Sequence, residues 1–195
     1  MESVDWVAVI TGMSMGLALA ATCGLRAFLP LFVVSLLAYL GKIELSESFV
    51  WMAQPVAVGG LGIAVVLEMA GDKFPVVDHF LDAAALVIKP MAAMVATASV
   101  MTEFDPMLTA IIGLVLGGSM AQGIHLIKAK LRLLSSALTA TIANPFISLM
   151  EDIVALLATI LAFLLPILVF VLAVVASVWG FKLWRSRKDQ AEITE

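Results

Sequence analysis

Long apolar runs without charge are the feature that most constrains this chain. Residues 153–181 contain no charged side chain over 29 positions, and residues 6–25 and 48–67 contain none either. In residues 106–127, His125 is the only ionisable side chain. A helix crosses the hydrocarbon core of a bilayer with about 20 apolar residues. Each of these runs is therefore long enough to span a membrane.

The composition points to the same solvent. Of the 195 residues, 63% are hydrophobic, whereas a soluble domain is about half apolar. A surplus of this size cannot be buried in one water-soluble core, so lipid must be part of the solvent. We predict a single all-α transmembrane domain over residues 1–185 and a polar cytoplasmic tail over residues 186–195. The start, MESVDW, is acidic where a secretory signal is basic, so we expect the first helix to be retained.

Proline, glycine and charged residues divide the chain into seven expected helical elements. Their ranges are 5–24, 27–41, 49–70, 76–101, 107–132, 146–165 and 167–184. The second is short and contains Pro30, which suggests a tilted, re-entrant or partly interfacial helix. The final apolar run would measure about 43 Å as one helix, more than the core of about 30 Å.

Two segments leave the number of spans open. Either Pro166 marks a tight hairpin, or one long kinked helix leaves the bilayer. Residues 133–145 are uncharged but rich in serine and threonine, and they could form a re-entrant half-helix. The expected fold is a polytopic bundle of six to seven membrane helices, some of them short, kinked or re-entrant.

Alternating helices would sort the charged residues to two sides. One side collects nine of the eleven basic residues, namely Arg26, Lys73, Lys128, Lys130, Arg132, Lys182, Arg185, Arg187 and Lys188. The other collects Lys42 and the acidic residues Glu2, Asp5, Glu44, Glu47, Glu103 and Asp105. Because basic residues stay on the cytoplasmic side, we expect the N-terminus outside and the C-terminus in the cytoplasm.

Small residues recur every three or four positions in three of the expected helices. The stripes are Gly12, Gly16, Ala20 and Gly24; Gly113, Gly117 and Ala121; and Ser148, Asp152, Ala155, Thr159 and Ala162. Such stripes let membrane helices approach closely, so we interpret them as packing faces. GLALAATC (16–23) also resembles GLVLGGSM (113–120), and PVVDHFLD (75–82) resembles PFISLMED (145–152). These matches indicate either a degenerate internal repeat or chance similarity.

Charged residues gather in two places within this apolar chain. The stretch LEMAGDKFPVVDHFLD (67–82) carries Glu68, Asp72, Asp78 and Asp82. Pro75 suits the first turn of a helix, which would bring Asp78, Asp82 and Lys89 close to one helical face. Asn144 and Pro145 form a second helix start, which carries Glu151 and Asp152 inward.

The position of these residues suggests a binding site. A charge deep in a span costs at least about 2.5–3.5 kcal/mol, so such residues should face the bundle interior. We predict an ion- or proton-binding site formed by Glu68, Asp78, Asp82, Glu151 and Asp152. Arg26 and Lys89 would be its charge partners, and His79 and His125 are candidates for a proton relay. Carboxylates suit Mg²⁺, Mn²⁺ or Ca²⁺, and buried carboxylates also suit protons.

Structural interpretations stand beside this one. Asp72 and Asp78 could be solvated loop and first-turn residues, and Asp82, Glu151 and Asp152 could form a polar clamp between helices. We expect Arg26, Lys128, Lys130 and Arg132 to be anchors for lipid headgroups. The basic tail KLWRSRK is interpreted as an orientation signal, with no nucleic-acid partner.

Three motifs together resemble a known family. GLRAFLPL (24–31), DKFPVVDHFLD (72–82) and NPFISLMED (144–152) resemble the bacterial membrane family called domain of unknown function 4126, over about residues 10–185. The resemblance implies a multi-span protein of the bacterial plasma membrane and implies no activity. EMAGDK (68–73) is also similar to the Glu-x-Gly-Asp-Lys-Thr signature of small cation exchangers. It has one extra residue, Phe74 in place of the hydroxyl residue, and no second copy.

Three functions fit these observations. The first is a small transporter or channel that binds protons or a cation at its acidic site. The second is a structural or partner-binding membrane bundle. The third is a metal-dependent enzyme acting on a lipid phosphate, with Arg26 binding the anion. No complete catalytic signature is found, so we assign no catalytic residue and do not expect an enzyme.

Overall fold

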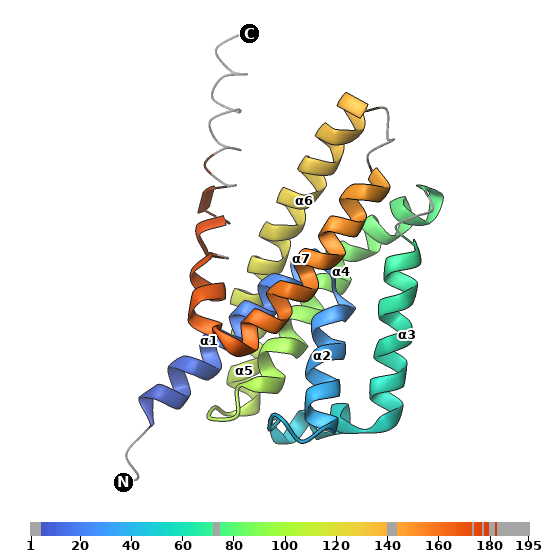
Figure 1. Cartoon of the computed structure of the whole chain (residues 1–195). Helices are drawn as coiled ribbons and strands as arrows, with labels where there is room; N and C mark the ends of the chain where they lie inside the picture. Colours follow the sequence, from blue (N-terminus) through green and yellow to red (C-terminus); the bar gives the residue numbers. More distant parts are fainter. Residues whose placement is uncertain are drawn as a thin grey trace.

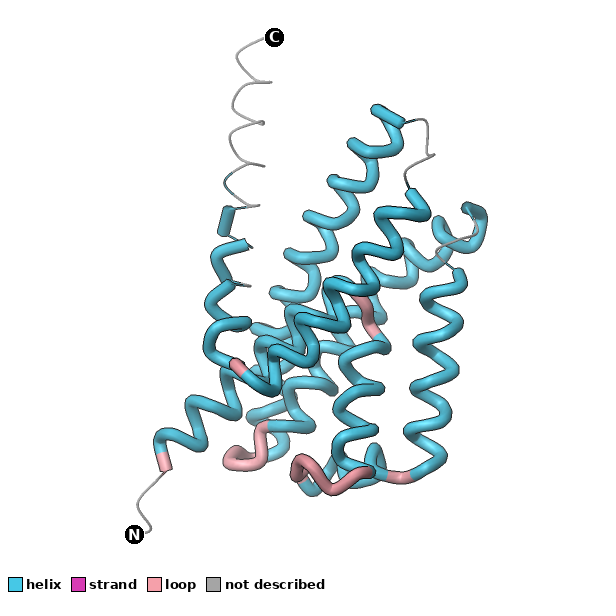
Figure 2. Tube along the Cα trace, viewed as in Figure 1, coloured by secondary structure: helices cyan, strands magenta, loops and turns pink. Residues whose placement is uncertain are grey.

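The computed structural model shows helices joined by short loops, with no strand among the residues that it describes (Figure 2). The structure describes residues 5–71, 75–139, 144–172, 174–176, 178–179 and 182. For residues 75–83, 132–133, 135–139 and 144–145 it describes the backbone alone.

Successive helices alternate in direction, close to the predicted ranges (Figure 1). The elements are α1 (Trp6–Leu25), α2 (Phe28–Tyr39), the 3₁₀ helix η1 (Glu47–Ala53), α3 (Pro55–Gly71), α4 (Pro75–Val100), α5 (Pro106–Ile112), the π-helical turn η2 (Gly113–Gly117), α6 (Gly118–Thr139) and α7 (Asn144–Leu164). Helices α1, α3 and α5–α6 run one way, and α2, α4 and α7 run the other way (Figure 1).

Three of the described helices are long and apolar enough to cross a membrane. They comprise residues Trp6–Leu25, Pro106–Leu131 and Phe146–Leu164, and η1 with α3 makes a fourth if this pair, bent by 73°, is one span. Phe28–Tyr39 and Ala84–Val100 are shorter apolar helices. These helices indicate a membrane protein, and a count of six to seven spans stays a prediction.

The last apolar run forms a hairpin and not one long helix. Leu165 is a bend, helical structure resumes over residues 166–172, and this segment turns back from the end of α7 (Figure 1). The missing N–H of Pro166 suits the start of a helix. Of the expected half-helix at 133–145, residues up to Thr139 continue α6, and residues 140–143 lie outside the described ranges.

Local sequence sets the helix ends at the acidic end of the bundle. The Asp5 side chain accepts hydrogen bonds from the backbone N–H groups of Val7 and Ala8, at 3.0 and 3.2 Å. Asp105, which precedes Pro106, caps α5 in the same way. Aspartate is a favoured N-cap residue. The starts of α1 and α5 and the end of α2 lie at the same end of the molecule (Figure 1).

The interior is built from small residues, as the stripes predict. A Cβ added at Gly24 would lie 2.5 Å from the Ala121 carbonyl oxygen, and one at Gly113 would lie 2.8 Å from that of Met94. The five residues of the stripe on α7, from Ser148 to Ala162, are all buried. The packing interpretation is therefore confirmed.

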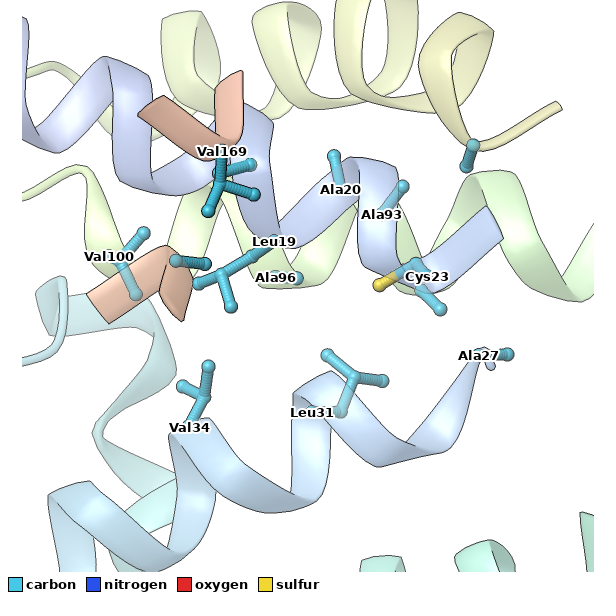
Figure 3. Close-up of a cluster of buried hydrophobic side chains, with 14 of the residues drawn as sticks. Leu19, Ala20, Cys23, Ala27, Leu31, Val34, Ala93, Ala96, Val100 and Val169 are labelled. Atoms are coloured by element: carbon cyan, nitrogen blue, oxygen red, sulfur yellow. The ribbon is translucent and has the colours of Figure 1, made fainter. Parts of the chain in front are cut away.

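Larger apolar side chains fill one cluster beside these close contacts. Figure 3 shows members of this cluster from α1, α2, α4 and the 166–172 segment, including Leu19, Leu31, Val34, Val100 and Val169. Val169 is only 8% exposed. The hairpin therefore belongs to the packed bundle.

Candidate functional site

The site is positioned by a break between two helices inside the bundle. Helix α1 ends at Leu25 and α2 begins at Phe28, and the linking residues Arg26 and Ala27 are only 1% and 2% exposed. The terminal N–H and C=O groups of a helix have no partner within it. Because this turn is buried, its backbone groups need partners from other helices.

Glu68 of α3 caps the start of α2. Its Oε1 accepts a hydrogen bond from the Ala27 N–H at 2.8 Å, and its Oε2 accepts one from the Phe28 N–H at 3.1 Å. Ala27 itself provides no side-chain cap. A carboxylate also suits the positive end of the helix dipole. Glu68 therefore holds the α1–α2 turn from a third helix.

Two lysines hold the end of α1. Lys89 Nζ of α4 donates to the Gly24 carbonyl oxygen at 2.9 Å, and Lys128 Nζ of α6 donates to that of Leu25 at 3.3 Å. Cations suit the negative end of a helix dipole. Lys128 is only 8% exposed, so the expectation that it anchors lipid headgroups was wrong.

Lys89 also contacts His125 of α6. The two side chains are buried, and Lys89 Nζ lies 2.8 Å from His125 Nδ1. A hydrogen bond at this distance needs a lone pair on one of the two nitrogens, because an ammonium group and a protonated ring nitrogen are both donors. One of the two nitrogens therefore donates at this contact and the other accepts.

A proline in α4 fixes how these two helices meet. Pro90 lies inside α4 and has no N–H to donate to the Leu86 carbonyl, four residues earlier. The Gln122 side chain of α6 donates to that carbonyl at 2.6 Å instead. On α6, Gln122 lies about one helical turn before His125. On α4, Pro90 is the residue next to Lys89. This contact therefore supports the Lys89–His125 pair.

Helix α7 contributes the two carboxylates of the site. Asp152 forms an ion pair with Arg26, and Arg26 also donates to the Ser148 hydroxyl at 3.2 Å. Ser148 and Asp152 are four residues apart, so they share a helix face. Glu151 Oε2 lies 3.0 Å from Lys128 Nζ.

Seven residues thus form one assembly, which we call the buried charge network. They are Arg26, Glu68, Lys89, His125, Lys128, Glu151 and Asp152. Lys89 lies 14 residues after the start of α4, and His125 lies 14 residues before the end of α6, which at 1.5 Å per residue is about 21 Å in each case. The Lys89–His125 contact therefore lies well within the lengths of α4 and α6.

The chain matches the family described as domain of unknown function (DUF4126) over residues 13–186. It belongs to this family. No curated protein and no solved structure shows detectable similarity to it. The family resemblance read from the sequence is confirmed, and the family description carries no activity. For this member of DUF4126, function must be argued from the network itself.

The structure brings together part of the predicted site. Glu68, Glu151 and Asp152 lie in the network, with Arg26 and Lys89. The side chains of Asp78, His79 and Asp82 lie outside the described part, so their expected place beside Lys89 stays a prediction. Among the described side chains, no group of three histidine, cysteine, aspartate or glutamate residues could hold a metal ion.

Two cavities formed by described residues lie away from the network. One of about 300 Å³ lies toward the acidic end, where its lining includes Met15 of α1, Glu44 and Glu103. The other, about 590 Å³, is an apolar groove between Thr11 and residues 164–171.

The tight packing of Arg26 against Asp152 gives no support to a lipid phosphate bound at Arg26.

Sequence reasoning missed three residues that build the network. Lys128 was assigned to the membrane surface, and Gln122 and Ser148 were given no site role. Gln122 carried a signal, since it is a polar residue within an apolar span and the neighbouring span contains a proline that leaves one carbonyl free. Ser148 was detected only as a small residue of a packing stripe.

Proposed function

We propose that this protein is a small membrane transporter or channel, and that its buried charge network binds protons or a cation. The observation that carries the proposal is the break between α1 and α2. Two helix ends meet inside the bundle and are held by ionisable side chains from α3, α4 and α6. In transporters, helix ends that lie within the membrane often take part in binding ions.

Energetics support a functional role for the network. Ionisable residues inside a membrane are expensive and tend to mark ion or proton pathways. A longer loop at the surface could join α1 to α2, and apolar packing could then hold the two helices without buried charges. The chain instead buries Lys89, His125 and Lys128, each less than 10% exposed, around the end of α1.

We further propose the placement in the membrane. The seven alternating helical segments would form six to seven spans of a bacterial plasma membrane, as one domain over residues 1–185 with a polar tail at 186–195. The N-terminus would lie outside and the C-terminus in the cytoplasm. The directions of the helices are consistent with a degenerate internal repeat. Helix α1 runs in the same direction as α5–α6, and α4 runs in the same direction as α7 (Figure 1).

A structural bundle is the second candidate, and a specific observation favours it. The described carboxylates of the network all have partners: Asp152 is paired with Arg26, Glu151 is paired with Lys128, and Glu68 accepts hydrogen bonds from two backbone N–H groups. Such pairing suits a polar clamp between helices. In this case the network would stabilise the fold and bind nothing.

Flux measurements in vesicles separate the two candidates. The purified protein is reconstituted with a trapped pH-sensitive dye, and separately with dyes for Mg²⁺, Mn²⁺ and Ca²⁺. We expect flux of one of these ions in the wild type, at least tenfold less flux in Asp152→Asn, and unchanged flux in the exposed control Glu103→Gln. If folded wild-type protein moves none of these ions, the transport proposal is wrong and the structural bundle stands.

A further inference from the structure

The short helix η1 lies across the end of the bundle. It leads into α3 at a bend of 73°, and it lies at the acidic end of the molecule, where it packs against α2 (Figure 1). If α3 crosses the membrane, a helix at this angle to α3 lies close to the membrane plane. The position of η1 therefore raises the question of which solvent its outer surface meets.

One face of η1 is fixed to the bundle. In a 3₁₀ helix, side chains three positions apart point the same way, which places Phe49 and Met52 on one face. Met52 is fully buried in the main apolar cluster, and Phe49 packs against that cluster. The Ser35 hydroxyl of α2 donates to the Met52 carbonyl oxygen, and the Ser46 N–H donates to that of Ser99 in α4. The remaining faces of η1 are therefore held outward.

The outward faces of η1 carry both apolar and polar side chains. Val50 is 57% exposed and Trp51 is 51% exposed, and this apolar surface continues onto α3 through Val56. Glu47 and Ser48 of the first turn are also exposed. Apolar side chains are unfavourable in water, and a carboxylate is costly in hydrocarbon. A helix that exposes both kinds of side chain fits the boundary between these two solvents.

Amphipathic aromatic residues gather at the same end of the molecule. Tyr39, the one tyrosine of the sequence, ends α2, and Trp6 begins α1. Both are more than half exposed, as Trp51 is. Tryptophan and tyrosine are enriched at membrane interfaces, where their rings lie at the level of the headgroups. Three such side chains on three elements therefore indicate a common interfacial level.

We infer that η1 lies in the interfacial layer of the bilayer, with Val50 and Trp51 among the phospholipid headgroups and Glu47 toward water. Interfacial helices bind in this way through an apolar surface beside a polar one. Helix α3 would then cross the membrane by itself, since its 17 residues measure about 25 Å. The inference concerns the boundary of the membrane and does not depend on transport.

The level of η1 also gives a depth for the α1–α2 turn. Helix α2 has 12 residues between this turn and the end at Tyr39, which is about 18 Å, and tilting α2 only reduces that depth. Arg26 and Ala27 would therefore lie no more than about 18 Å below the interface, within a hydrocarbon core of about 30 Å. This is the membrane depth that the proposed ion-binding site requires.

Depth-resolved quenching of tryptophan fluorescence tests the inference. The variant Trp6→Phe/Trp179→Phe/Trp184→Phe keeps Trp51 as its single tryptophan. It is reconstituted into phosphatidylcholine vesicles that carry a nitroxide either at the headgroup or near the methyl end of the acyl chain. We expect the headgroup nitroxide to quench Trp51 at least twofold more strongly than the deep one.

A matched control places the reporter within the span. In the same background, Trp51→Phe with Val66→Trp moves the tryptophan to an exposed position, about 17 Å along α3 from Pro55. There the deep nitroxide should quench more strongly. Trp51 quenched best by the deep nitroxide would show that η1 enters the hydrocarbon core, and Trp51 quenched by neither would show that η1 lies in water. Either result overturns the inference.

Spin labelling gives a second measurement that keeps every tryptophan. Because Cys23 is buried, a nitroxide label reacts at Val50→Cys, and at Val66→Cys and Glu103→Cys as references for lipid and water. Oxygen, which concentrates in lipid, and a water-soluble nickel chelate then compete to relax the label. We expect Val50→Cys to fall between the two references. A Val50→Cys label that matches either reference overturns the inference.

Discussion

Arg26 shows how burial decides the role of a single charged side chain. At the end of a span, an arginine usually reaches the lipid headgroups, but here it is 1% exposed and paired with Asp152. A buried charge without its partner is far more costly than the pair itself. The Arg26–Asp152 pair should therefore tolerate joint replacement better than single replacement.

Asp152→Asn leaves the Arg26 charge buried with one fewer anion. We expect it to lower the free energy of unfolding in detergent micelles by about 3–5 kcal/mol, measured by chemical denaturation. The double variant Arg26→Met/Asp152→Leu should recover at least half of this loss. A single variant as stable as the wild type would contradict a buried ion pair, and Glu103→Gln, which is exposed, is the matched control.

At the scale of elements, backbone contacts decide how α1, α4 and α6 pack. Gly24 and Gly113 allow helices to approach until backbone atoms touch, and small residues serve this purpose in membrane helices generally. Gly59 and Gly60 of α3 have no atom within 4 Å of an added Cβ. Gly24 and Gly113 are therefore needed for close helix packing, whereas Gly59 and Gly60 have room for a side chain.

Gly24→Ala should destabilise the bundle, because the new methyl group would meet the Ala121 carbonyl and Ile124. We expect a loss of about 1–3 kcal/mol, typical of overpacking, read as a lower thermal midpoint in micelles. Gly60→Ala should leave stability unchanged or raise it by up to about 1 kcal/mol, as helix propensity predicts. Equal effects of the two substitutions would contradict the packing described for α1.

Pro90 and Gln122 link α4 to α6. Pro90 has no N–H for the Leu86 carbonyl, and the Gln122 side chain of α6 donates to that carbonyl instead. Gln122→Leu should cost about 1–3 kcal/mol, because it leaves the Leu86 carbonyl without a donor. In a Pro90→Ala background, residue 90 regains its N–H, so the same substitution should cost less. A double-mutant cycle on unfolding free energies measures this coupling, and strictly additive losses would show that the two residues act independently.

At the scale of the whole molecule, acidic helix ends lie at one end of the bundle. Asp5, Glu44, Glu47, Glu103 and Asp105 flank the starts or ends of helices that meet there (Figure 1). In the proposed orientation this end faces outward, because the positive-inside rule places the basic residues on the cytoplasmic side. The side of the membrane that each end of the bundle faces is therefore a testable property.

Cysteine labelling tests that orientation, because Cys23 is the only cysteine in the sequence and is buried. In intact cells, an impermeant maleimide should label Glu103→Cys but not Lys182→Cys. After permeabilisation it should label both. The reverse pattern would show that the bundle is inverted, and labelling of both from outside would contradict opposite placement of the two positions.

Local sequence predicted the positions of most helices, but residues 49–70 were expected as one helix and instead form η1 and α3, which are bent by 73°. Proline residues and the lengths of the uncharged runs act within a few residues, so most helix starts could be predicted from the sequence. The packing stripes were equally readable, since a period of four residues places side chains on one face of a helix. The membrane class followed from apolar surplus alone.

The choice of partners was decided only by the tertiary structure. Arg26 and Ser148 are 122 residues apart in sequence, and their contact depends on the depth and rotation at which α1 meets α7. Glu68 was assigned to ion binding with other acids, yet its carboxylate caps α2, because the α1–α2 turn lies buried beside α3. Sequence shows which charges enter the membrane, but only packing between distant helices determines which charges meet.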